Sequence, residues 1–283
     1  MKIGIVGLGL IGGSMAKAIK THTEHTVLGM DIIESVVYKA YLLEAIDGEL
    51  AAEDLKECDL VFLAMYPQDT IDFVKVNAEL FKKNGLVLDL CGVKEAVCTP
   101  ILPVAREHGF IYIGAHPMAG REFSGFSHSS GSLFEGASMV LVPFHGTTIE
   151  TVQSVKELCK QIGFTCIQIS TPEEHDRMIA FTSQLAHVVS SAYIKSPTAM
   201  EHIGFSAGSF KDMTRVAKLN ETMWTELFLD NPRYLCEEIE LLIQHLQEYN
   251  EAIRDGDRNR LYNLLKEGRE IKAVVDGEVL EDK

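Results

Sequence analysis

The stretch KIGIVGLGLIGGS, residues 2–14, decides the fold of this chain. It begins with an apolar run, Lys2–Val6, that indicates a buried β-strand, and it leads into a helical segment, Ile11–Thr21. The turn between them, Gly7-Leu8-Gly9-Leu10-Ile11-Gly12, has the spacing Gly-x-Gly-x-x-Gly. In this pattern the first glycine permits a tight turn, the second lets a pyrophosphate approach, and the third allows close packing of helix and strand. We therefore expect these six residues to bind a dinucleotide at the start of the helix.

Asp31 specifies which dinucleotide the turn is expected to bind. It ends the second expected strand, Thr26–Met30, 24 residues after Gly7. A carboxylate at this place can accept hydrogen bonds from both ribose hydroxyls, and it would repel a 2′-phosphate. No arginine lies next to Asp31 to reverse that preference, so we expect NAD as the cofactor. The alternative is a glycine-rich turn whose Asp31 only caps the following helix.

The rest of the chain divides into two parts of different character. Up to about residue 170, short apolar strands alternate with helical stretches, and the expected strands after the second are Leu60–Met65, Leu86–Leu90, Ile111–Ile113, Met139–Val142 and Thr165–Ile169. The expected helices between them are Ile33–Leu43, Asp69–Phe81 and Ala96–Glu107. Beyond Pro172 the spacing is helical, with segments His175–Ser196, Met213–Leu219, Thr222–Leu229, Pro232–Arg254 and Arg258–Val275. We therefore predict a Rossmann-type doubly wound α/β sheet in residues 1–170, followed by an all-helical C-terminal domain in residues 171–283.

Composition and charge exclude several classes of protein. A formal net charge of −15 disfavours nucleic acid as a partner, because phosphates require an excess of Lys and Arg. No apolar run reaches the roughly 18 residues that a membrane span needs. The first apolar stretch, Ile3–Met15, contains glycines and no cleavage site, so it is not expected to be a signal peptide. The six cysteines show neither a C-x-x-C pair nor metal-finger spacing, which predicts reduced thiols, no metal site and a cytoplasmic protein.

The segments that follow the strands are expected to surround the ligands, because open α/β sheets bind them at the carboxyl ends of the strands. Tyr66 and Pro67 follow the third strand, and Gly92 follows the fourth, so we expect all three to border the cofactor. Lys94 either binds a substrate carboxylate or only caps a helix. His116 ends the next strand, beside the expected nicotinamide site, and we expect it to act as a general acid or base.

Four segments of this sequence resemble the prephenate dehydrogenase family of tyrosine biosynthesis. They are GLGLIGGS at 7–14, DLCGVK at 89–94, GAHPMAGREFSG at 114–125 and GSFKDMTRVA at 208–217, and the pair Met223-Trp224 also fits. The resemblance implies an oxidative decarboxylation, in which NAD accepts a hydride from prephenate, carbon dioxide leaves and 4-hydroxyphenylpyruvate forms.

The resemblance also implies roles for individual residues. His116 would accept the proton of the ring hydroxyl as the hydride departs, and Arg215 would bind a substrate carboxylate. The remaining substrate-binding residues would be His187 beside the substrate, Gly208 and Trp224 around the pocket, and Glu122 at its mouth. Other interpretations stay open: Arg215 could pair with Asp212 at a surface or interface, and His187 and Trp224 could be structural.

Two positions depart from the family pattern. The family often has a serine where Gly92 stands, and its hydroxyl assists the catalytic histidine. In this chain that assistance must come from elsewhere, such as water or a neighbouring backbone group. The family also often has a histidine at the position of Gln184.

Two other functions compete with this one. A β-hydroxyacid dehydrogenase or imine reductase would need a catalytic lysine in the helical domain, and neither Lys195 nor Lys211 lies in such a motif. A sensor that binds NAD without turnover would need neither His116 nor Arg215. Within the family, the sequence does not distinguish prephenate from arogenate as the substrate.

The helical part carries apolar stripes that are too long for a bundle of its size to bury. We therefore expect a homodimer formed through the helical domain. The Ser- and Gly-rich segment Ser124–Gly136 predicts a flexible loop, which either gates the site or is a surface excursion.

Overall fold

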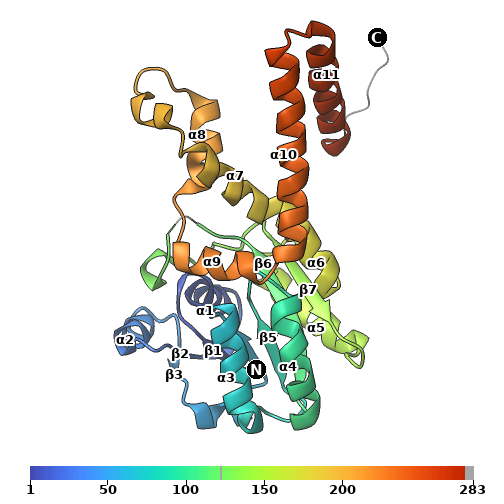
Figure 1. Cartoon of the computed structure of the whole chain (residues 1–283). Coiled ribbons are helices and arrows are strands. Elements are labelled where there is room, and N and C mark those ends of the chain that lie inside the picture. The colour runs from blue at the N-terminus through green and yellow to red at the C-terminus, as the bar shows by residue number, and fades with distance from the viewer. Residues whose placement is uncertain (122, 278–283) are drawn as a thin grey trace. The chain divides into compact units, whose positions relative to one another are not determined.

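The computed structural model describes residues 1–121 and 123–277, so Glu122, one of the expected substrate-binding residues, lies outside the described residues. In the described part, eight strands form one sheet in the order β3-β2-β1-β4-β5-β6-β7-β8 (Figure 1). The strands are β1 (Lys2–Val6), β2 (Thr26–Met30), β3 (Gly48–Glu49), β4 (Leu60–Leu63), β5 (Leu86–Asp89), β6 (Ile111–Met118), β7 (Ser138–Pro143) and β8 (Cys166–Ile169). All neighbouring strands are parallel except β6 and β7. The first six strands have the doubly wound order of a Rossmann fold, which confirms the predicted fold class.

Helices cover both faces of the sheet because successive strand residues point to opposite sides. The covering helices are α1 (Leu10–His22), α2 (Glu34–Leu42), α3 (Pro67–Asn77), α4 (Glu95–His108) and α5 (Ile149–Gln161). Phe62 of β4 packs in the core that α1, α2 and α5 share, while its neighbours Val61 and Leu63 pack in the core beneath α3 and α4. Burial on both faces explains the almost continuous apolar sequence of these strands.

The glycine turn has the geometry that its sequence predicts. Gly7 has a φ of +87°, and its N–H donates to the carbonyl oxygen of Met30 at 2.9 Å. A Cβ at Gly12 would lie 1.8 Å from the Gly7 carbonyl oxygen, so only glycine fits there. A Cβ at Gly9 would meet nothing within 4 Å, which leaves that side of the turn open. The carboxylate of Asp31 accepts the Leu8 N–H at 2.8 Å and thereby ties the turn to the end of β2.

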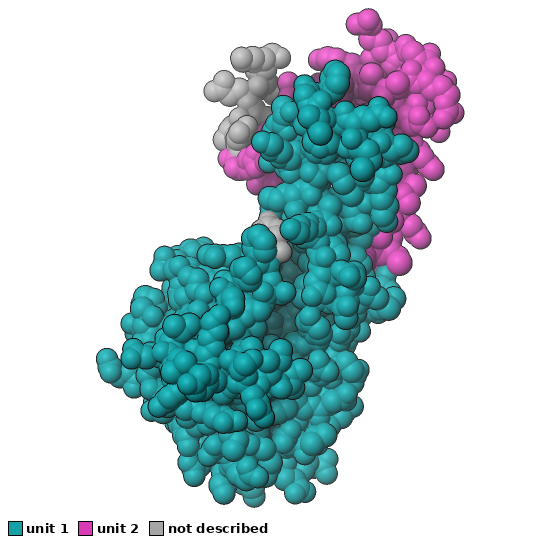
Figure 2. Space-filling view, turned by 90° about the vertical axis from the view of Figure 1, so that its left-hand side faces the viewer, with its two compact units in different colours: residues 1–232 teal, residues 233–283 magenta. Residues whose placement is uncertain are grey.

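The chain divides into two compact units at Pro232 (Figure 2). The first unit contains the sheet, α6 (Pro172–Ile179), a π-helical segment (Ala180–Gln184), α7 (Leu185–Tyr193), α8 (Gly208–Thr214) and α9 (Glu221–Leu229). The second unit consists mainly of α10 (Pro232–Arg254) and α11 (Arg258–Val275), where the Tyr249 hydroxyl donates to the Leu264 carbonyl at 3.1 Å. The boundary predicted at residue 170 falls inside the first unit, and as a division between domains it stays a prediction.

Four local features differ from the sequence-based expectations. The two-residue strand β3 and the helix α5 were not expected. Strand β6 continues to Met118 because it pairs with β7 beyond its pairing with β5, so His116 lies within the strand and opposite Val140. The single helix expected over 175–196 is interrupted by the π-helical turn.

The loop expected over 124–136 is anchored to the first domain. Phe126 and Phe134 are buried in the core, the ammonium of Lys17 donates to the Ser129 carbonyl at 2.9 Å, and the Ser130 N–H donates to the Ser14 hydroxyl at 3.0 Å. These contacts hold the loop against α1, which favours a packed excursion over a gate.

A buried ion pair lies at the carboxyl end of β5. The side chains of Asp89 and Lys94 are both 0% exposed, and the Lys94 ammonium donates to Asp89 and, at 2.7 Å, to the carbonyl of Ala115. Asp89 also accepts the Tyr112 hydroxyl at 2.7 Å and the Cys91 N–H at 3.0 Å. The pair therefore fastens the segment after β5 to β6, and its charges are compensated within the core.

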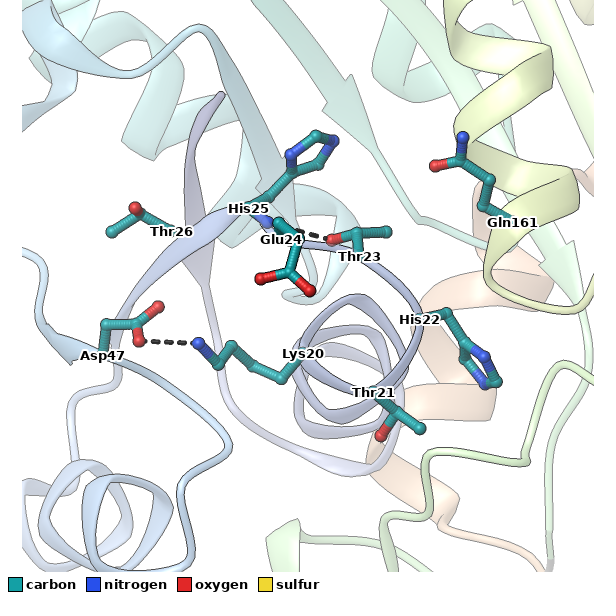
Figure 3. A pocket seen from close by; sticks show the side chains of 9 residues that line it. All are labelled: Lys20, Thr21, His22, Thr23, Glu24, His25, Thr26, Asp47 and Gln161. Carbon is teal, nitrogen blue, oxygen red and sulfur yellow. Dashed lines mark hydrogen bonds and ion pairs between the residues drawn. The ribbon is translucent and has the colours of Figure 1, made fainter.

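A surface hollow lies near the amino ends of the strands, at the other end of the sheet from the buried ion pair (Figure 3). It is lined by the end of α1, the start of β2 and two residues from elsewhere: Lys20, Thr21, His22, Thr23, Glu24, His25, Thr26, Asp47 and Gln161. Lys20 and Asp47 form an exposed ion pair across it at 2.6 Å. Because it lies at the amino ends of β1 and β2, it is separate from the ligand-binding edge of the sheet.

Among the residues with a described structure, no helix combines the length and the apolar character that crossing a membrane requires.

We predict that Gly12→Ala destabilises the fold much more than Gly9→Ala. The new methyl of Gly12→Ala would collide with the Gly7 carbonyl, and overpacking of this severity costs about 3 kcal/mol or more of unfolding free energy. Gly9 is the N-cap of α1 with open space around it, so its replacement costs about 1 kcal/mol or less. Urea unfolding of the two variants measures the difference, and equal midpoints would contradict the proposed packing.

We predict that Lys94→Met lowers the free energy of unfolding by about 3–5 kcal/mol, because it leaves the Asp89 carboxylate buried without its counter-ion. The matched control is Lys82→Met, which removes a 2.5 Å ion pair with Asp59 whose side chains are 42% and 38% exposed. Water screens such a pair, so the control is expected to lose less than about 1 kcal/mol. Urea unfolding checks both, and a small loss in Lys94→Met would show that the buried pair contributes little.

Candidate active site

The fold places polar side chains from other segments, including His175 and Lys94, near His116. His116 is half-buried, and its Nδ1 lies 2.9 Å from Nε2 of His175. Desolvation lowers the pKa of His116 well below its usual value, and the nearby His175 and Lys94 lower it further. The imidazole is therefore neutral at physiological pH, as a general base requires.

His175 and Asp176, at the middle of α6, were not found from the sequence. His175 Nδ1 lies 2.7 Å from Oδ1 of Asp176, and the Asp176 carboxylate accepts the backbone N–H groups of Lys94 at 2.7 Å and Glu95 at 2.8 Å. Burial lowers the pKa of His175 to about 3, so this ring is neutral as well. The local sequence signal is a His-Asp pair early in a helix. That pattern does not indicate which residue the pair contacts, and the contact with His116 is formed only in the folded structure.

Gly92 lies on the other side of the His116 ring. A Cβ at Gly92 would be 3.9 Å from His116 Nε2 and 3.2 Å from a methyl of Leu227. The side chain of Leu227 therefore occupies the space beside this glycine. On its Nδ1 side, His116 contacts the imidazole of His175. The expectation that a water or a backbone group assists His116 in place of a serine at position 92 stays a prediction.

Gln184 is buried in a set of hydrogen bonds that joins three helical segments. Its Nε2 donates to the Leu227 carbonyl at 2.9 Å, and its Oε1 accepts from Asn231 Nδ2 at 2.8 Å. Asn231 Nδ2 also donates to the Asp176 carbonyl at 2.8 Å. Gln184 thus holds the end of α9 against α6 and does not itself offer a group to a ligand.

Three of the residues expected to bind substrate lie together. The rings of His187 and Trp224 stack with centroids 3.7 Å apart, and His187 Nδ1 donates to the Ser183 carbonyl at 2.9 Å. Burial lowers the pKa of His187, and the positive charge of the neighbouring Arg215 also lowers it. Arg215 begins the short helix η6 (Arg215–Ala217) and is exposed, which suits capture of an anionic ligand.

Helix α9 connects this group to His116. Trp224 stacks on His187, and Leu227, one turn later, reaches the position beside Gly92. The same helix contacts the start of α3, because the Gln68 N–H donates to Glu226 at 2.7 Å. Gly208, the first residue of α8, is exposed, and an added Cβ there would meet nothing within 4 Å.

The burial of Lys94 argues against the expected contact with a substrate carboxylate. Its side chain is 0% exposed and its ammonium already donates to Asp89 and Ala115. It also does not cap α4 with its side chain, although it is the N-cap residue of that helix. Its function in the structure is to neutralise Asp89 beneath the site.

The residues expected to hold NAD fit that cofactor. The open side of Gly9 admits a pyrophosphate at the start of α1, and the carboxylate of Asp31 lies at the end of β2, where a ribose would bind. Tyr66 is the N-cap and Pro67 the first residue of α3, at the carboxyl end of β4. Within residues 1–121 and 123–277, no group of three or more His, Cys, Asp or Glu is arranged to hold a metal ion.

Comparisons with known proteins point to one family. The model of the prephenate dehydrogenase nucleotide-binding domain matches residues 15–168, and the model of the prephenate dehydrogenase dimerization domain matches residues 171–267. A prephenate dehydrogenase of Lactococcus lactis is 31% identical, over 97% of this chain and 77% of its own length. A cyclohexadienyl dehydrogenase of Zymomonas mobilis is 28% identical, over 96% of this chain and 95% of its own length.

A solved structure shows the same fold over nearly the whole chain. The crystal structure of prephenate dehydrogenase from A. aeolicus, in complex with hydroxyphenyl propionate and NAD+, has a TM-score of 0.86 and 27% sequence identity. The alignment covers 97% of this chain and 98% of that one. This chain therefore belongs to the prephenate dehydrogenase family of NAD-dependent oxidoreductases.

Proposed function

We propose that this protein is a cytoplasmic prephenate dehydrogenase, which converts prephenate to 4-hydroxyphenylpyruvate and carbon dioxide in tyrosine biosynthesis. The observation that carries the proposal is the position of His116, whose Nε2 faces Gly92 and whose Nδ1 contacts His175, near the carboxyl ends of the strands. Burial lowers the pKa of this imidazole. When bound, NAD supplies the hydride acceptor for the reaction. The protein's own groups bind and orient the substrate and accept a proton.

His116 is the catalytic base of this proposal. Its Nε2 would accept the proton of the ring hydroxyl while the hydride leaves the same carbon atom. Electron density released from the oxygen then favours departure of the hydride, and loss of the ring carboxylate as carbon dioxide completes the aromatic ring. The low pKa of His116 keeps the imidazole ready for this step at neutral pH.

Arg215 is the proposed partner of a substrate carboxylate, because a guanidinium can hold a carboxylate with two parallel hydrogen bonds. His187 donates its Nδ1 proton to Ser183, so its Nε2 is unprotonated and can accept a hydrogen bond. Stacking on Trp224 fixes the orientation of that ring. Arogenate is a second candidate substrate, since a cyclohexadienyl dehydrogenase aligns with almost the whole chain.

We predict that the wild-type protein forms NADH from NAD and prephenate, and that His116→Asn lowers kcat by about 100-fold or more, as expected for removal of a general base. The increase in NADH absorbance is the measurement, and the same assay with arogenate compares the two substrates. The control is His145→Asn at an exposed position in the loop after β7, which is expected to keep wild-type activity. No turnover of either substrate by the wild type would overturn the proposed function, and full activity of His116→Asn would overturn the assigned base.

We further propose that two copies of the chain associate through α10 and α11. Leu246 and Ile253 on α10, and Leu265 and Ile271 on α11, are each more than half exposed in the second unit. Apolar side chains that recur along two neighbouring helices mark an interaction surface. The family's dimerization-domain model covers α10 and reaches residue 267 in α11, which supports a second copy as the occupant.

We predict that the wild-type protein sediments at twice the monomer mass, and that the double variant Leu246→Glu with Ile253→Glu sediments as a monomer. Burying two carboxylates in an apolar interface without partners costs more than the interface returns. The matched control is Gln244→Glu, an exposed change on the same helix, which is expected to leave the mass unchanged. A monomeric wild type would contradict the proposed assembly.

A further inference from the structure

Three side chains form a continuous line of hydrogen bonds behind the proposed base. The line runs from the Asp176 carboxylate to His175 Nδ1 at 2.7 Å, and from His175 Nε2 to His116 Nδ1 at 2.9 Å. His175 and Asp176 are 3% and 1% exposed, so bulk water does not compete for these contacts. No sequence motif indicates a role for either residue.

The carboxylate end of this line determines the direction of every hydrogen bond in it. Asp176 accepts two backbone N–H groups, from Lys94 and Glu95, at the start of α4. Burial raises the pKa of Asp176, whereas the two backbone N–H donors and the Lys94 ammonium lower it. We infer that the carboxylate is ionised, because each of its oxygens accepts a backbone N–H at the positive end of the helix, and an ionised carboxylate can only accept hydrogen bonds. The atom of His175 that faces Asp176, Nδ1, must therefore carry the proton.

The protonation of His175 then decides that of His116. A neutral imidazole carries one N–H, and in His175 it is on Nδ1, so Nε2 is an acceptor. The contact to His116 is a hydrogen bond only when His116 Nδ1 carries the proton and donates it. The second nitrogen of His116, Nε2, is then left with a free lone pair, on the side of the ring that faces Gly92.

We propose that His175, oriented by Asp176, is a positioning residue that holds His116 in the tautomer with an unprotonated Nε2 and accepts the Nδ1 hydrogen bond of the imidazolium formed during the reaction. This inference rests on the proposed role of His116 as the base. In this chain, the contact of His175 with Nδ1 of His116 would take the place of the serine that the family often has at the position of Gly92, on the opposite side of the ring.

No proton is gained or lost over the whole reaction of the substrate. The hydroxyl proton of the substrate moves to His116 Nε2, and the hydride on the same carbon moves to NAD. The bond between the ring and its carboxylate then breaks, its electron pair enters the ring, and carbon dioxide leaves. His116 returns its proton to the phenolic oxygen, so no further oxidant or acid is needed. While His116 is charged, its Nδ1–H donates to His175, whose own proton stays directed at Asp176.

This arrangement compensates for the surroundings of the base. Desolvation, a positive charge on His175 and the Lys94 ammonium all disfavour a positive charge on His116. Burial lowers the pKa of His175 to about 3, so that ring is neutral and its Nε2 is an acceptor. An acceptor at Nδ1, with a carboxylate behind it, stabilises that charge at the moment it forms. A histidine or a glutamine at position 175 can serve as this acceptor, whereas an alanine cannot.

The tautomer is the direct test, and nitrogen NMR of protein labelled with 15N-histidine measures it without any turnover. Loss of signals in His116→Asn assigns the ring. In the wild type at neutral pH, we expect His116 to show a protonated Nδ1 and an unprotonated Nε2. A wild-type His116 with the proton on Nε2 would overturn the inference, whatever the substrate proves to be.

Variants at position 175 test the consequence for catalysis. We expect His175→Ala to lower kcat by about 10-fold or more, with KM for NAD and prephenate changed less than about 3-fold, and to lose the single tautomer. His175→Gln is expected to recover most of this loss, because its amide oxygen can accept from His116 while its amide nitrogen donates to Asp176. His145→Ala is the control for removal of a histidine.

Three results distinguish this inference from a merely structural role and from failure of the proposed function. A wild type that forms no NADH from either prephenate or arogenate would refute the function and leave the tautomer measurement intact. Unchanged kcat in His175→Ala, or equal losses in the Ala and Gln variants, would refute the positioning role. Melting temperatures show whether each variant is folded. If His175→Ala does not fold, the nitrogen NMR spectrum of the wild type and the kcat of His175→Gln test the inference instead.

Discussion

The carboxylate of Asp176 is the constraint on which the site depends. It accepts backbone N–H groups from the first residues of α4 and the ring N–H of His175, so it joins α6 to the segment that follows β5. Because an ionised carboxylate only accepts hydrogen bonds, it imposes a direction on everything attached to it. Beneath it, the buried pair of Asp89 and Lys94 fastens that same segment to β6, which carries His116. The orientation of the base is thus set by groups from three separate elements.

Leu227 couples the two departures from the family pattern. Its methyl groups lie beside Gly92, where a side chain would approach within 3.2 Å of them, and its carbonyl accepts the amide of Gln184. A serine at 92 and a histidine at 184 would each alter the packing around this one residue. Helix α9, which contains Leu227, also carries Trp224 and so connects the proposed base with the proposed substrate-binding residues. A change at position 92 or 184 would therefore alter the packing of α9 and, through it, the position of Trp224.

Much of the fold could be predicted because its signals are local. Strand β1, the glycine turn and α1 follow from residues 2–14, and the predicted bounds of α10 and α11 coincide with the observed ones. Strand β3 was missed because two residues carry no periodicity, and the length of β6 was underestimated because its last residues are strand only through pairing with β7. The contacts of Lys94 could not be predicted either, because no sequence pattern indicates that its ammonium forms a buried ion pair with Asp89.

The sequence by itself determined the glycine turn and predicted an acidic residue for a ribose and a histidine beside the cofactor, because each depends on spacing along one stretch of chain. It also determined the family, through four short motifs. Only the tertiary structure decided which groups surround His116: His175 is 59 residues away along the chain and Asp176 is 82 residues from Lys94. Hydrogen bonds over such separations are specified by the packing of α6 against α4, and packing between distant segments leaves no periodic signal in the sequence.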